Sequence, residues 1–268
     1  MKQLKDRVVL VTGASSGIGW ETALAFGAQG CRVALAARRA EKLRELGDLL
    51  RARGAQTLEI ACDVQDASQV KRAFEATIQK WGRLDVLINN AGILEHAHFE
   101  RQPLSSMEEI LKTNLFGALY AVREAIARMR RQGEGHIVNV ASIAGLMGLP
   151  YMAVYCASKF ALVGLTESLR REFYGSGITL TAFCPGMVDT SMVSGIMRDS
   201  KLRRSPTIKT PQAVAQKIVQ ATRRRSPEII YGDIPGALIK TSHFLPGLTD
   251  WAVHAVARRG HPLAKAAT

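Results

Sequence analysis

The sequence predicts an α/β fold, in which a single domain is built on a parallel β-sheet with helices packed against it. Short runs of β-branched and apolar residues alternate along the chain with longer segments that favour helices, and a glycine-rich turn joins the first run to the first helix. The chain has 268 residues, and no linker, internal repeat or low-complexity tract divides it. We therefore expect one domain over residues 1–232, with residues 233–268 as its C-terminal helical extension.

The first strand, residues 7–11, runs directly into T-G-A-S-S-G-I-G at 12–19, and helix-forming residues 20–29 follow. Glycines allow a backbone to approach a ligand closely, and the free N–H groups at a helix start favour an anion. Ser15 and Ser16 add hydroxyl donors. Three glycines between a strand and a helix therefore favour phosphate binding over the alternative, a turn with no ligand.

A second strand at 31–37 completes a βαβ unit and is followed by Arg38 and Arg39. In NAD-binding versions of this unit, an acidic residue at the end of the strand holds the ribose 2′-hydroxyl. The positive charge of arginines at a helix start is unfavourable, because the helix dipole is positive at that end. A 2′-phosphate facing the arginines would make their electrostatic interaction favourable. We interpret the pair as an NADP(H) site with Arg38 as the principal contact. The alternative is solvated helix charge that pairs with Glu41 and Glu45.

Later elements continue the alternation. The predicted strands cover 56–61, 84–88, 136–141, 178–183 and 228–231, and the predicted helices cover 40–53, 67–80, 106–131, 155–174 and a segment that starts at residue 211. Asp63 follows a strand and either faces the ligand or caps the next helix. Ser106 opens a capping box with Glu109, and Asn114 lies in a helix interior, which does not favour asparagine. Residues 191–206 have the weak periodicity of a lid.

Tyr155 and Lys159 are four residues apart on a predicted helix, so their side chains stack on one face, a turn apart. A free phenol has a pKa near ~10 and is a poor proton donor or acceptor at neutral pH. One ammonium about 4 Å away, at an effective dielectric of ~20, would lower that pKa by about 3 units. Tyr155 is then a candidate general acid or base. An isolated Y-x-x-x-K is more often a solvated surface pair, so the interpretation depends on the other motifs.

Seven motifs between about residues 7 and 231 together resemble the short-chain dehydrogenase/reductase family. They are T-G-A-S-S-G-I-G at 12–19, C-D-V at 62–64, N-N-A-G at 89–92, Asn114, Ser142, Y-C-A-S-K at 155–159 and P-G-M-V-D-T at 185–190. The resemblance implies a Rossmann fold whose seven-stranded parallel sheet has the order 3-2-1-4-5-6-7, with helices on both faces.

The resemblance also implies a role for each motif. Tyr155 exchanges the proton, Lys159 lowers its pKa and holds the nicotinamide ribose, Ser142 hydrogen-bonds the substrate oxygen, and Asn114 keeps a water in a proton relay. Cofactor contacts are implied for Gly13, Ser15, Ser16, Gly17, Ile18, Gly19, Asp63, Val64, Asn90, Ala91, Gly92, Tyr155, Lys159, Pro185, Gly186, Val188 and Thr190, to which our interpretation adds Arg38 and Arg39. No metal is expected.

These roles predict an NADP(H)-dependent oxidoreductase that interconverts a carbonyl and an alcohol. Apolar residues of the loops favour a lipophilic substrate, similar to a steroid, retinoid or other lipid: Leu94, Leu146, Met147, Leu149, Tyr151, Met152 and Met187. The substrate contacts we expect are Ser142, Leu149, Tyr155 and Met187. His96 and His98 either contact substrate or are solvated. A 3-oxoacyl-carrier-protein reductase and, in another class, a non-catalytic dinucleotide-sensing regulator stay as alternatives.

The net charge of +13 raises nucleic acid and anionic lipid as partners, but the basic residues are scattered, so we expect no specific nucleic-acid binding. The four cysteines are widely spaced, and the polar start and the short apolar runs carry neither a signal segment nor a membrane span. We therefore expect a cytoplasmic protein with reduced thiols.

The resemblance implies a homodimer or homotetramer that assembles through the helices at 106–131 and 155–174. The C-terminal extension carries an amphipathic stripe, formed by Leu248, Trp251, Ala252, Ala255 and Val256. Two interpretations of the stripe stay open: it packs against its own domain or a subunit partner, or it makes weak peripheral contact with a membrane.

Overall fold

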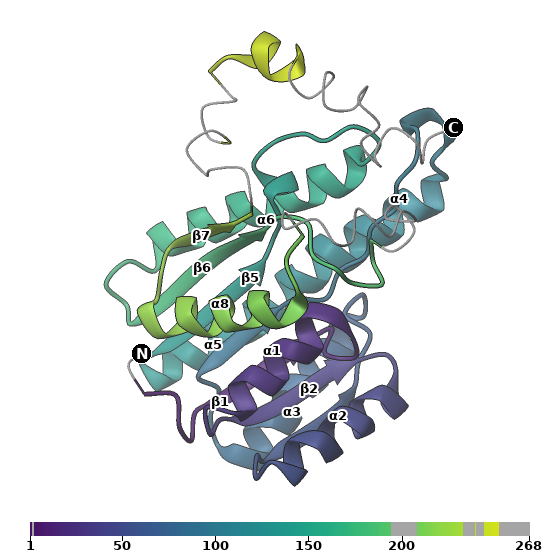
Figure 1. Ribbon diagram of the computed structural model, residues 1–268. Coiled ribbons are helices and arrows are strands. Elements are labelled where there is room, and N and C mark those ends of the chain that lie inside the picture. Colours follow the sequence, from purple (N-terminus) through teal and green to yellow (C-terminus); the bar gives the residue numbers. More distant parts are fainter. Residues whose placement is uncertain (2, 194–207, 233–238, 240–243, 252–268) are drawn as a thin grey trace.

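The computed structural model describes residues 1, 3–193, 208–232, 239 and 244–251 of the chain. Its centre is a sheet of seven parallel strands in the order β3-β2-β1-β4-β5-β6-β7 (Figure 1), which confirms the expected topology. The strands are β1 (Val8–Thr12), β2 (Arg32–Ala37), β3 (Thr57–Ala61), β4 (Val86–Asn89), β5 (Gly135–Val140), β6 (Ile178–Pro185) and β7 (Glu228–Tyr231). The helices are α1 (Gly17–Gly27), α2 (Ala40–Ala52), α3 (Ala67–Trp81), α4 (Leu104–Leu111), α5 (Gly117–Gln132), α6 (Ala153–Glu172) and α8 (Pro211–Arg224), with short helical turns η1 (Phe99–Arg101), η2 (Lys112–Phe116) and η3 (Ile143–Gly145).

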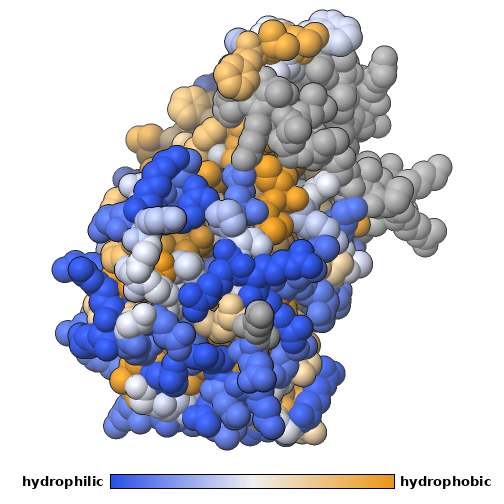
Figure 2. Space-filling model, turned by 90° about the vertical axis from the view of Figure 1, so that its left-hand side faces the viewer, coloured by the Kyte–Doolittle hydropathy of each residue, from blue (hydrophilic) through white to orange (hydrophobic). Residues whose placement is uncertain are grey.

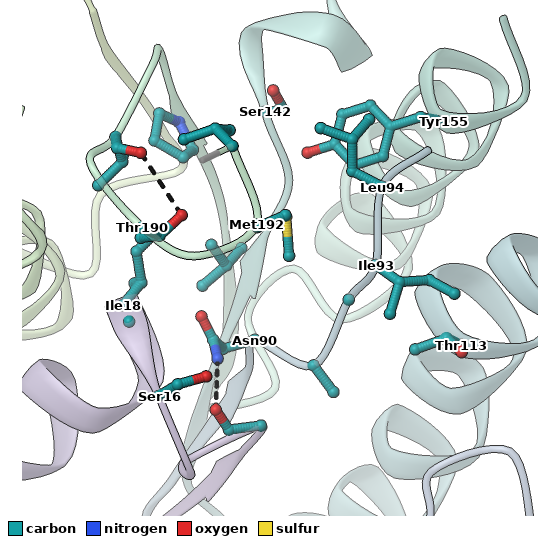
Figure 3. A pocket seen from close by; sticks show the side chains of 18 of the residues that line it. Ser16, Ile18, Asn90, Ile93, Leu94, Thr113, Ser142, Tyr155, Thr190 and Met192 are labelled. Atoms are coloured by element: carbon teal, nitrogen blue, oxygen red, sulfur yellow. Dashed lines mark hydrogen bonds between the residues drawn. The ribbon is translucent and has the colours of Figure 1, made fainter. Parts of the chain in front are cut away.

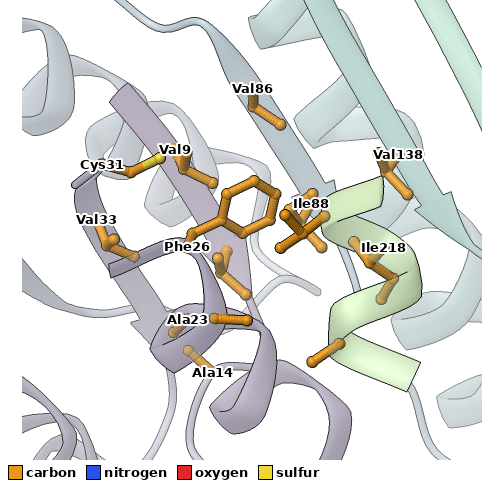
Figure 4. Close-up of a cluster of buried hydrophobic side chains, with 14 of the residues drawn as sticks. Val9, Ala14, Ala23, Phe26, Cys31, Val33, Val86, Ile88, Val138 and Ile218 are labelled. Atoms are coloured by element: carbon orange, nitrogen blue, oxygen red, sulfur yellow. The ribbon is translucent and has the colours of Figure 1, made fainter. Parts of the chain in front are cut away.

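Helices cover both faces of the sheet because successive strand side chains point to opposite faces. On one face Val9 packs in a cluster with residues of α1, α2 and α8, and Figure 4 shows Phe26, Ile88 and Ile218 pointing toward one another there. On the other face Val8 packs in a second cluster with residues of α3 and α5. A strand that is buried on both faces needs a continuous apolar run, which is why parallel strands such as β1 are recognisable in the sequence.

The long helix predicted over 106–131 is divided in the structure. It consists of α4, a π-helical turn η2 that contains Asn114, and α5. A π turn carries an extra residue and marks functional sites in many helices. The predicted capping box is wrong: α4 begins at Leu104 with Pro103 as its N-cap, and the Ser106 hydroxyl donates to Glu95 instead. Proline sets this start because its ring fixes φ, which is −62° here.

A buried carboxylate, Asp85, organises the amino-terminal edge of the sheet, away from the loops that carry the motifs. It is fully buried, accepts hydrogen bonds from Arg7 (2.7 Å) and Arg83 (2.6 Å), and also accepts from the backbone N–H of Val8 (2.9 Å). Glu134 contacts the same two arginines at 2.7 and 3.1 Å. Because the carboxylate is paired and hydrogen-bonded, its charge is tolerated inside the domain.

In the described part of the C-terminal extension, Ile239 is buried in a core cluster with Leu162 and Cys184, whereas most of segment 244–251 is exposed. Phe244 and Trp251 are 82% and 69% exposed, and Leu245 and Leu248 are also exposed. Segment 244–251 lies at the top of Figure 1, and apolar side chains gather at the top of the face in Figure 2. The predicted stripe positions Ala252, Ala255 and Val256 lie outside the described residues. Among the residues described, none of the helices is both long and apolar enough to cross a membrane.

Candidate active site

A cavity of about 670 Å³ lies at the carboxyl edge of the sheet, bordered by the loops that follow β1 to β6. Such an edge is where open α/β sheets bind their ligands, and this volume is in the usual range for a small-molecule site. Figure 3 shows Ser16, Ile18 and Asn90 at one end of the pocket and Ser142 and Tyr155 at the other. The predicted motifs, which are far apart in the sequence, are thus brought to one cavity.

The glycine loop at 13–19 is fixed by the turn that follows β4. The Asn90 side chain donates to the carbonyl oxygens of Thr12 (3.0 Å) and Gly13 (3.2 Å), and the Thr12 hydroxyl accepts from the Asn90 N–H (3.0 Å). Gly13 has a φ of +66°, and a Cβ there would lie 2.8 Å from Ala91 Cα. Gly19 lies behind the cavity wall, where a Cβ would meet the Gly13 oxygen at 2.3 Å. These glycines therefore allow the loop and the turn to touch.

Arg38 and Arg39 both line the cavity and are exposed, but they have different contacts. The Arg39 guanidinium donates to the hydroxyls of Ser15 (2.9 Å) and Ser16 (2.9 Å), so it lies against the glycine loop. Within the described chain, Arg38 makes no hydrogen bond or ion pair. The alternative pairing with Glu45 does not occur, because Glu45 accepts from Lys42 at 2.7 Å. Arg38 is thus a cation beside the cavity that no described carboxylate neutralises.

Asp63 and Val64 line the cavity after β3, as the sequence predicts. The alternative role of Asp63 as a helix cap falls to another residue. Asp66 is the N-cap of α3 and accepts from the backbone N–H groups of Ser68 (2.8 Å) and Gln69 (3.3 Å). Among the described residues, the Asp63 carboxylate accepts one hydrogen bond, a local one from the Gln65 N–H (3.0 Å).

Asn114 lies behind the cavity wall rather than on it, and it is 1% exposed. Its amide nitrogen donates to the Ile93 carbonyl (2.9 Å) and to the Ser158 hydroxyl (3.1 Å), while its oxygen accepts from the Ile93 N–H (2.8 Å). Asn114 therefore fixes the backbone of a residue that does line the cavity and ties it to α6. Its role in a water relay stays a prediction.

Ser142, Tyr155 and Lys159 meet where β5 ends and α6 begins. Ser142 is buried and caps η3 by accepting from the Ala144 N–H (3.1 Å), and its hydroxyl hydrogen-bonds with Tyr155. Lys159 is 4% exposed; its Nζ donates to the Val140 carbonyl (2.9 Å) and lies 5.7 Å from the centre of the Tyr155 ring. Helical spacing of four residues produces this stacking, as predicted.

The pKa values differ from the expectation that Lys159 brings the phenol close to neutrality. Burial raises the pKa of Tyr155 to about 12, although the hydrogen bond with Ser142 acts in the opposite direction. Burial also lowers the pKa of Lys159 to about 8. Desolvation is the largest cause of the shift for each group. The phenol is therefore protonated at neutral pH, which suits a proton donor.

The segment after β6 forms the wall opposite the glycine loop. Pro185, Gly186, Val188 and Thr190 all line the cavity. The wall is held from outside: the Gly186 N–H donates to the Tyr231 carbonyl (2.9 Å), and residues 187–189 exchange backbone hydrogen bonds of 3.0 Å with Lys209. Of the lid predicted over 191–206, only residues 191–193 are described, and all three line the cavity.

Apolar residues surround the end of the cavity that holds Ser142 and Tyr155. Predicted ones are Leu94, Leu149, Met152 and Met187, and the sequence reasoning missed Ile93, Ile143, Met192 and Val193. Ile93 directly follows N-N-A-G, which is the signal that could have identified it. Leu146 and Met147 are not on the wall, because both pack into a core cluster with Leu162 and Cys184. Tyr151, His96 and His98 also lie off the wall, where both imidazoles contact the Tyr151 ring.

The residues of the cavity fit a dinucleotide. Among the described residues, the Ser16 hydroxyl makes no capping bond to the first turn of α1, so the N–H groups of that turn are available to a phosphate. Gly17 has a φ of +57°, and a Cβ there would lie 3.1 Å from a methyl carbon of Thr190. A side chain at Gly17 would therefore narrow the opening between the glycine loop and the wall formed by residues 185–190. Two hydroxyls and a lysine at the far end suit a reacting carbonyl.

An anion-binding turn and a proton-donating phenol in one cavity are the groups that a dinucleotide-dependent oxidoreductase needs. Comparison with known proteins places the chain more narrowly: the family model described as short chain dehydrogenase matches residues 7–201, and the chain belongs to that family. Members of the family use a nicotinamide dinucleotide to oxidise alcohols or reduce carbonyls.

The relatives include an uncharacterised oxidoreductase from Staphylococcus saprophyticus, which is 36% identical over 225 residues, 81% of this chain and 90% of that protein. A 3-oxoacyl-[acyl-carrier-protein] reductase from Staphylococcus aureus is 36% identical over 202 residues, 75% of this chain and 81% of that protein. Among solved structures, a short chain dehydrogenase/reductase from Burkholderia phymatum in complex with NAD has a TM-score of 0.84 and 27% identity, with 93% of this chain and 97% of that chain covered.

Proposed function

We propose that the protein is an NADP(H)-dependent oxidoreductase that interconverts a carbonyl and an alcohol on a lipophilic substrate. The observation that carries the proposal is the meeting of the Ser142 and Tyr155 hydroxyls beside buried Lys159, at the apolar end of the cavity. A nicotinamide cofactor, when bound, supplies the hydride. The glycine loop, Asp63, the 90–92 turn, Lys159 and the 185–190 wall are the residues that would hold it.

In this mechanism Ser142 and Tyr155 orient the carbonyl and donate hydrogen bonds to its oxygen, which becomes negative as the carbon is reduced. The Tyr155 hydroxyl then passes its proton to the new alkoxide. With a pKa of about 12, the phenol carries that proton throughout the neutral range. Lys159, whose pKa is about 8, can gain and lose a proton near neutral pH at Nζ, so it suits the return of a proton toward Tyr155.

The preference for NADP(H) over NAD(H) is proposed from charge. Arg38 and Arg39 follow β2, where an acidic residue would hold a ribose 2′-hydroxyl. Arg39 is engaged by the serines of the glycine loop, whereas Arg38 has no partner within the described chain. We therefore keep Arg38 as the principal contact of a 2′-phosphate. An arginine suits this role because its guanidinium is always charged and forks onto phosphate oxygens.

Arg38→Ala weakens NADPH binding by about 10–100-fold, the loss of one or two hydrogen bonds to a charged group, and changes NADH binding little. Arg39→Ala weakens NADPH binding less than Arg38→Ala does, because the Arg39 guanidinium already donates hydrogen bonds to the glycine loop. Arg44→Ala is the matched control, an exposed arginine of α2 outside the cavity. Dissociation constants from cofactor fluorescence check the ranking. Equal losses for NADPH and NADH in Arg38→Ala would remove the NADP assignment.

The lipophilic substrate is supported by the apolar side chains that surround the two hydroxyls, Leu94, Leu149, Met152 and Met187 among them. A panel of carbonyl compounds tests the proposal by following NADPH absorbance. Bulky cyclic ketones are expected to have at least about ten-fold higher kcat/KM than small hydrophilic ketones, since each buried methylene contributes about 0.8 kcal/mol. A preference for a 3-oxoacyl thioester would favour the carrier-protein alternative, which the Staphylococcus aureus relative supports.

A non-catalytic regulator is the rival in another class. It would bind NADPH but reduce no member of the panel. The placement of both Ser142 and Lys159 next to Tyr155 argues against it, because cofactor sensing needs none of the hydroxyl chemistry.

Assembly and location stay predictions. Exposed apolar residues on the helices named for assembly, Leu104, Phe116 and Phe160, support a homodimer or homotetramer. The four cysteines are free buried thiols, which suits a reducing cytoplasm. The exposed residues of segment 244–251 are compatible with a subunit contact and with weak contact with a membrane surface, and buried Ile239 supports packing of the C-terminal extension against its own domain.

A further inference from the structure

Two of the loops that border the apolar end of the cavity contact each other, one after β4 and one before α6. Leu94 comes from the first loop, and Leu149 and Met152 come from the second. The three side chains pack in one small cluster with Cys156 and Tyr155. The shape offered to a substrate therefore depends on how these two loops are held together.

Tyr151, in the second loop, has a φ of +63°. Bulky L-residues rarely adopt this left-handed conformation, so the surroundings must hold it in place. The Tyr151 carbonyl accepts from the Ala97 N–H of the first loop (3.0 Å). Its ring contacts two imidazoles of that loop, with centroids 4.9 Å from His98 in an edge-on contact and 5.3 Å from His96. These are normal separations for favourable aromatic pairs.

Leu149, two residues before Tyr151, is held by α6. The Leu149 N–H donates to the Cys156 sulfur (3.4 Å), and the same thiol lies 3.9 Å from the Leu149 carbonyl oxygen, which it contacts as a donor. Leu149 is thus fixed to α6, while Tyr151 is fixed to the first loop. Tyr151, His96 and His98 lie off the cavity wall, so they can affect a substrate only through Leu94, Leu149 and Met152.

We propose that Tyr151, through its ring contacts with His96 and His98, holds the two loops together and so sets which substrates the apolar end of the cavity accepts. We call this set of contacts the latch. The three are positioning residues for specificity. The inference rests on the proposed function, because that function places the substrate against Leu94, Leu149 and Met152. It adds a use for the two loop histidines and for the left-handed Tyr151, which the catalytic machinery does not employ.

The test compares Tyr151→Ala, which removes the ring, with Tyr151→Phe, which keeps it. The readout is the ratio of kcat/KM for a bulky cyclic ketone to that for a small ketone. Tyr151→Phe is expected to keep this ratio, whereas Tyr151→Ala lowers it by about ten-fold, mainly through KM of the bulky ketone, with kcat and the Kd for NADPH little changed. The double variant His96→Ala/His98→Ala is expected to match Tyr151→Ala. Tyr174→Ala, at a site 93% exposed, is the control.

Tyr151→Gly separates the ring from the backbone. Glycine adopts a positive φ without strain, so this variant is expected to lose the specificity ratio like Tyr151→Ala while unfolding at a higher temperature than it. An unchanged ratio in Tyr151→Ala, or a fall in kcat with KM unchanged, would overturn the latch.

Hydrogen–deuterium exchange gives a readout that does not need a substrate. Tyr151→Ala is expected to speed amide exchange in residues 93–98, where nothing has been mutated, as well as in 146–152. Unchanged exchange in 93–98 overturns the latch even if every ketone is a poor substrate. Faster exchange there with no ketone reduction by the wild-type protein would instead keep the latch and remove the proposed function.

Discussion

Tyr155→Phe lowers kcat for ketone reduction by about 10²–10⁴-fold, the range that a positioned proton donor contributes, and leaves the Kd for NADPH nearly unchanged. The substitution removes a single oxygen at the cavity end that Ser142 shares, and the ring keeps its place over Lys159. When the carbonyl carbon accepts hydride, its oxygen becomes an alkoxide, and the variant has no Tyr155 hydroxyl to protonate it. Steady-state kinetics with NADPH and the best ketone of the panel measure the loss, and fluorescence titration measures the Kd.

Tyr174→Phe serves as the control, because this tyrosine is 93% exposed and lies outside the cavity. It should retain wild-type kinetics. A rate for Tyr155→Phe close to that of Tyr174→Phe would mean that the proton comes from elsewhere, and the proposed mechanism would be abandoned.

Asp85→Ala lowers the free energy of unfolding by about 3 kcal/mol, the lower end for removing one member of a buried ion pair. The lost carboxylate is fully buried and binds two guanidiniums and the Val8 N–H, and those groups keep only Glu134 as a nearby anion. We place the value at the lower end because the side chains of Arg7 and Arg83 are 29% and 42% exposed and regain part of their hydration. Urea unfolding followed by circular dichroism measures it.

Asp48→Ala is the matched control for this experiment. Asp48 pairs with Arg51 at 2.8 Å on the surface of α2 and is 76% exposed, so its loss is expected to change stability by less than about 1 kcal/mol. Similar losses for the two variants would show that the buried network is no more than a surface ion pair in its energetic effect.

The strands and the cofactor side of the cavity are the parts that the sequence predicts well. The inner strands are largely buried on both faces and appear as mostly apolar runs, whereas the edge strands β3 and β7 are only partly buried. The bounds of β7, Glu228–Tyr231, are nevertheless the predicted ones. Many residues that line the cavity follow strand ends directly, so once the strands are known, these loop residues are placed at one edge. Tyr155 and Lys159 reach the cavity from α6, and Gly19 and Asn114 act from behind the wall.

Helix starts and the substrate side depend on contacts that no local pattern contains. Asp66, rather than Asp63, caps α3, and Pro103, rather than Ser106, marks the start of α4. Leu146 and Leu149 have similar sequence surroundings, yet one lies in the core and the other lines the cavity, because the loop path between them is set by Cys156 and Tyr151. The pKa of Tyr155 depends on burial in the folded chain, which spacing to Lys159 does not reveal.

The most direct measurement of the central claim follows a labelled hydrogen. The purified protein would be given NADPH deuterated at the transferable position of the nicotinamide, together with the best ketone of the panel, and the product alcohol would be examined by mass spectrometry and NMR. The account predicts one deuterium on the carbinol carbon and an unlabelled hydroxyl, since Tyr155 supplies that proton and exchanges it with water. An alcohol whose carbinol carbon carries no deuterium would contradict it.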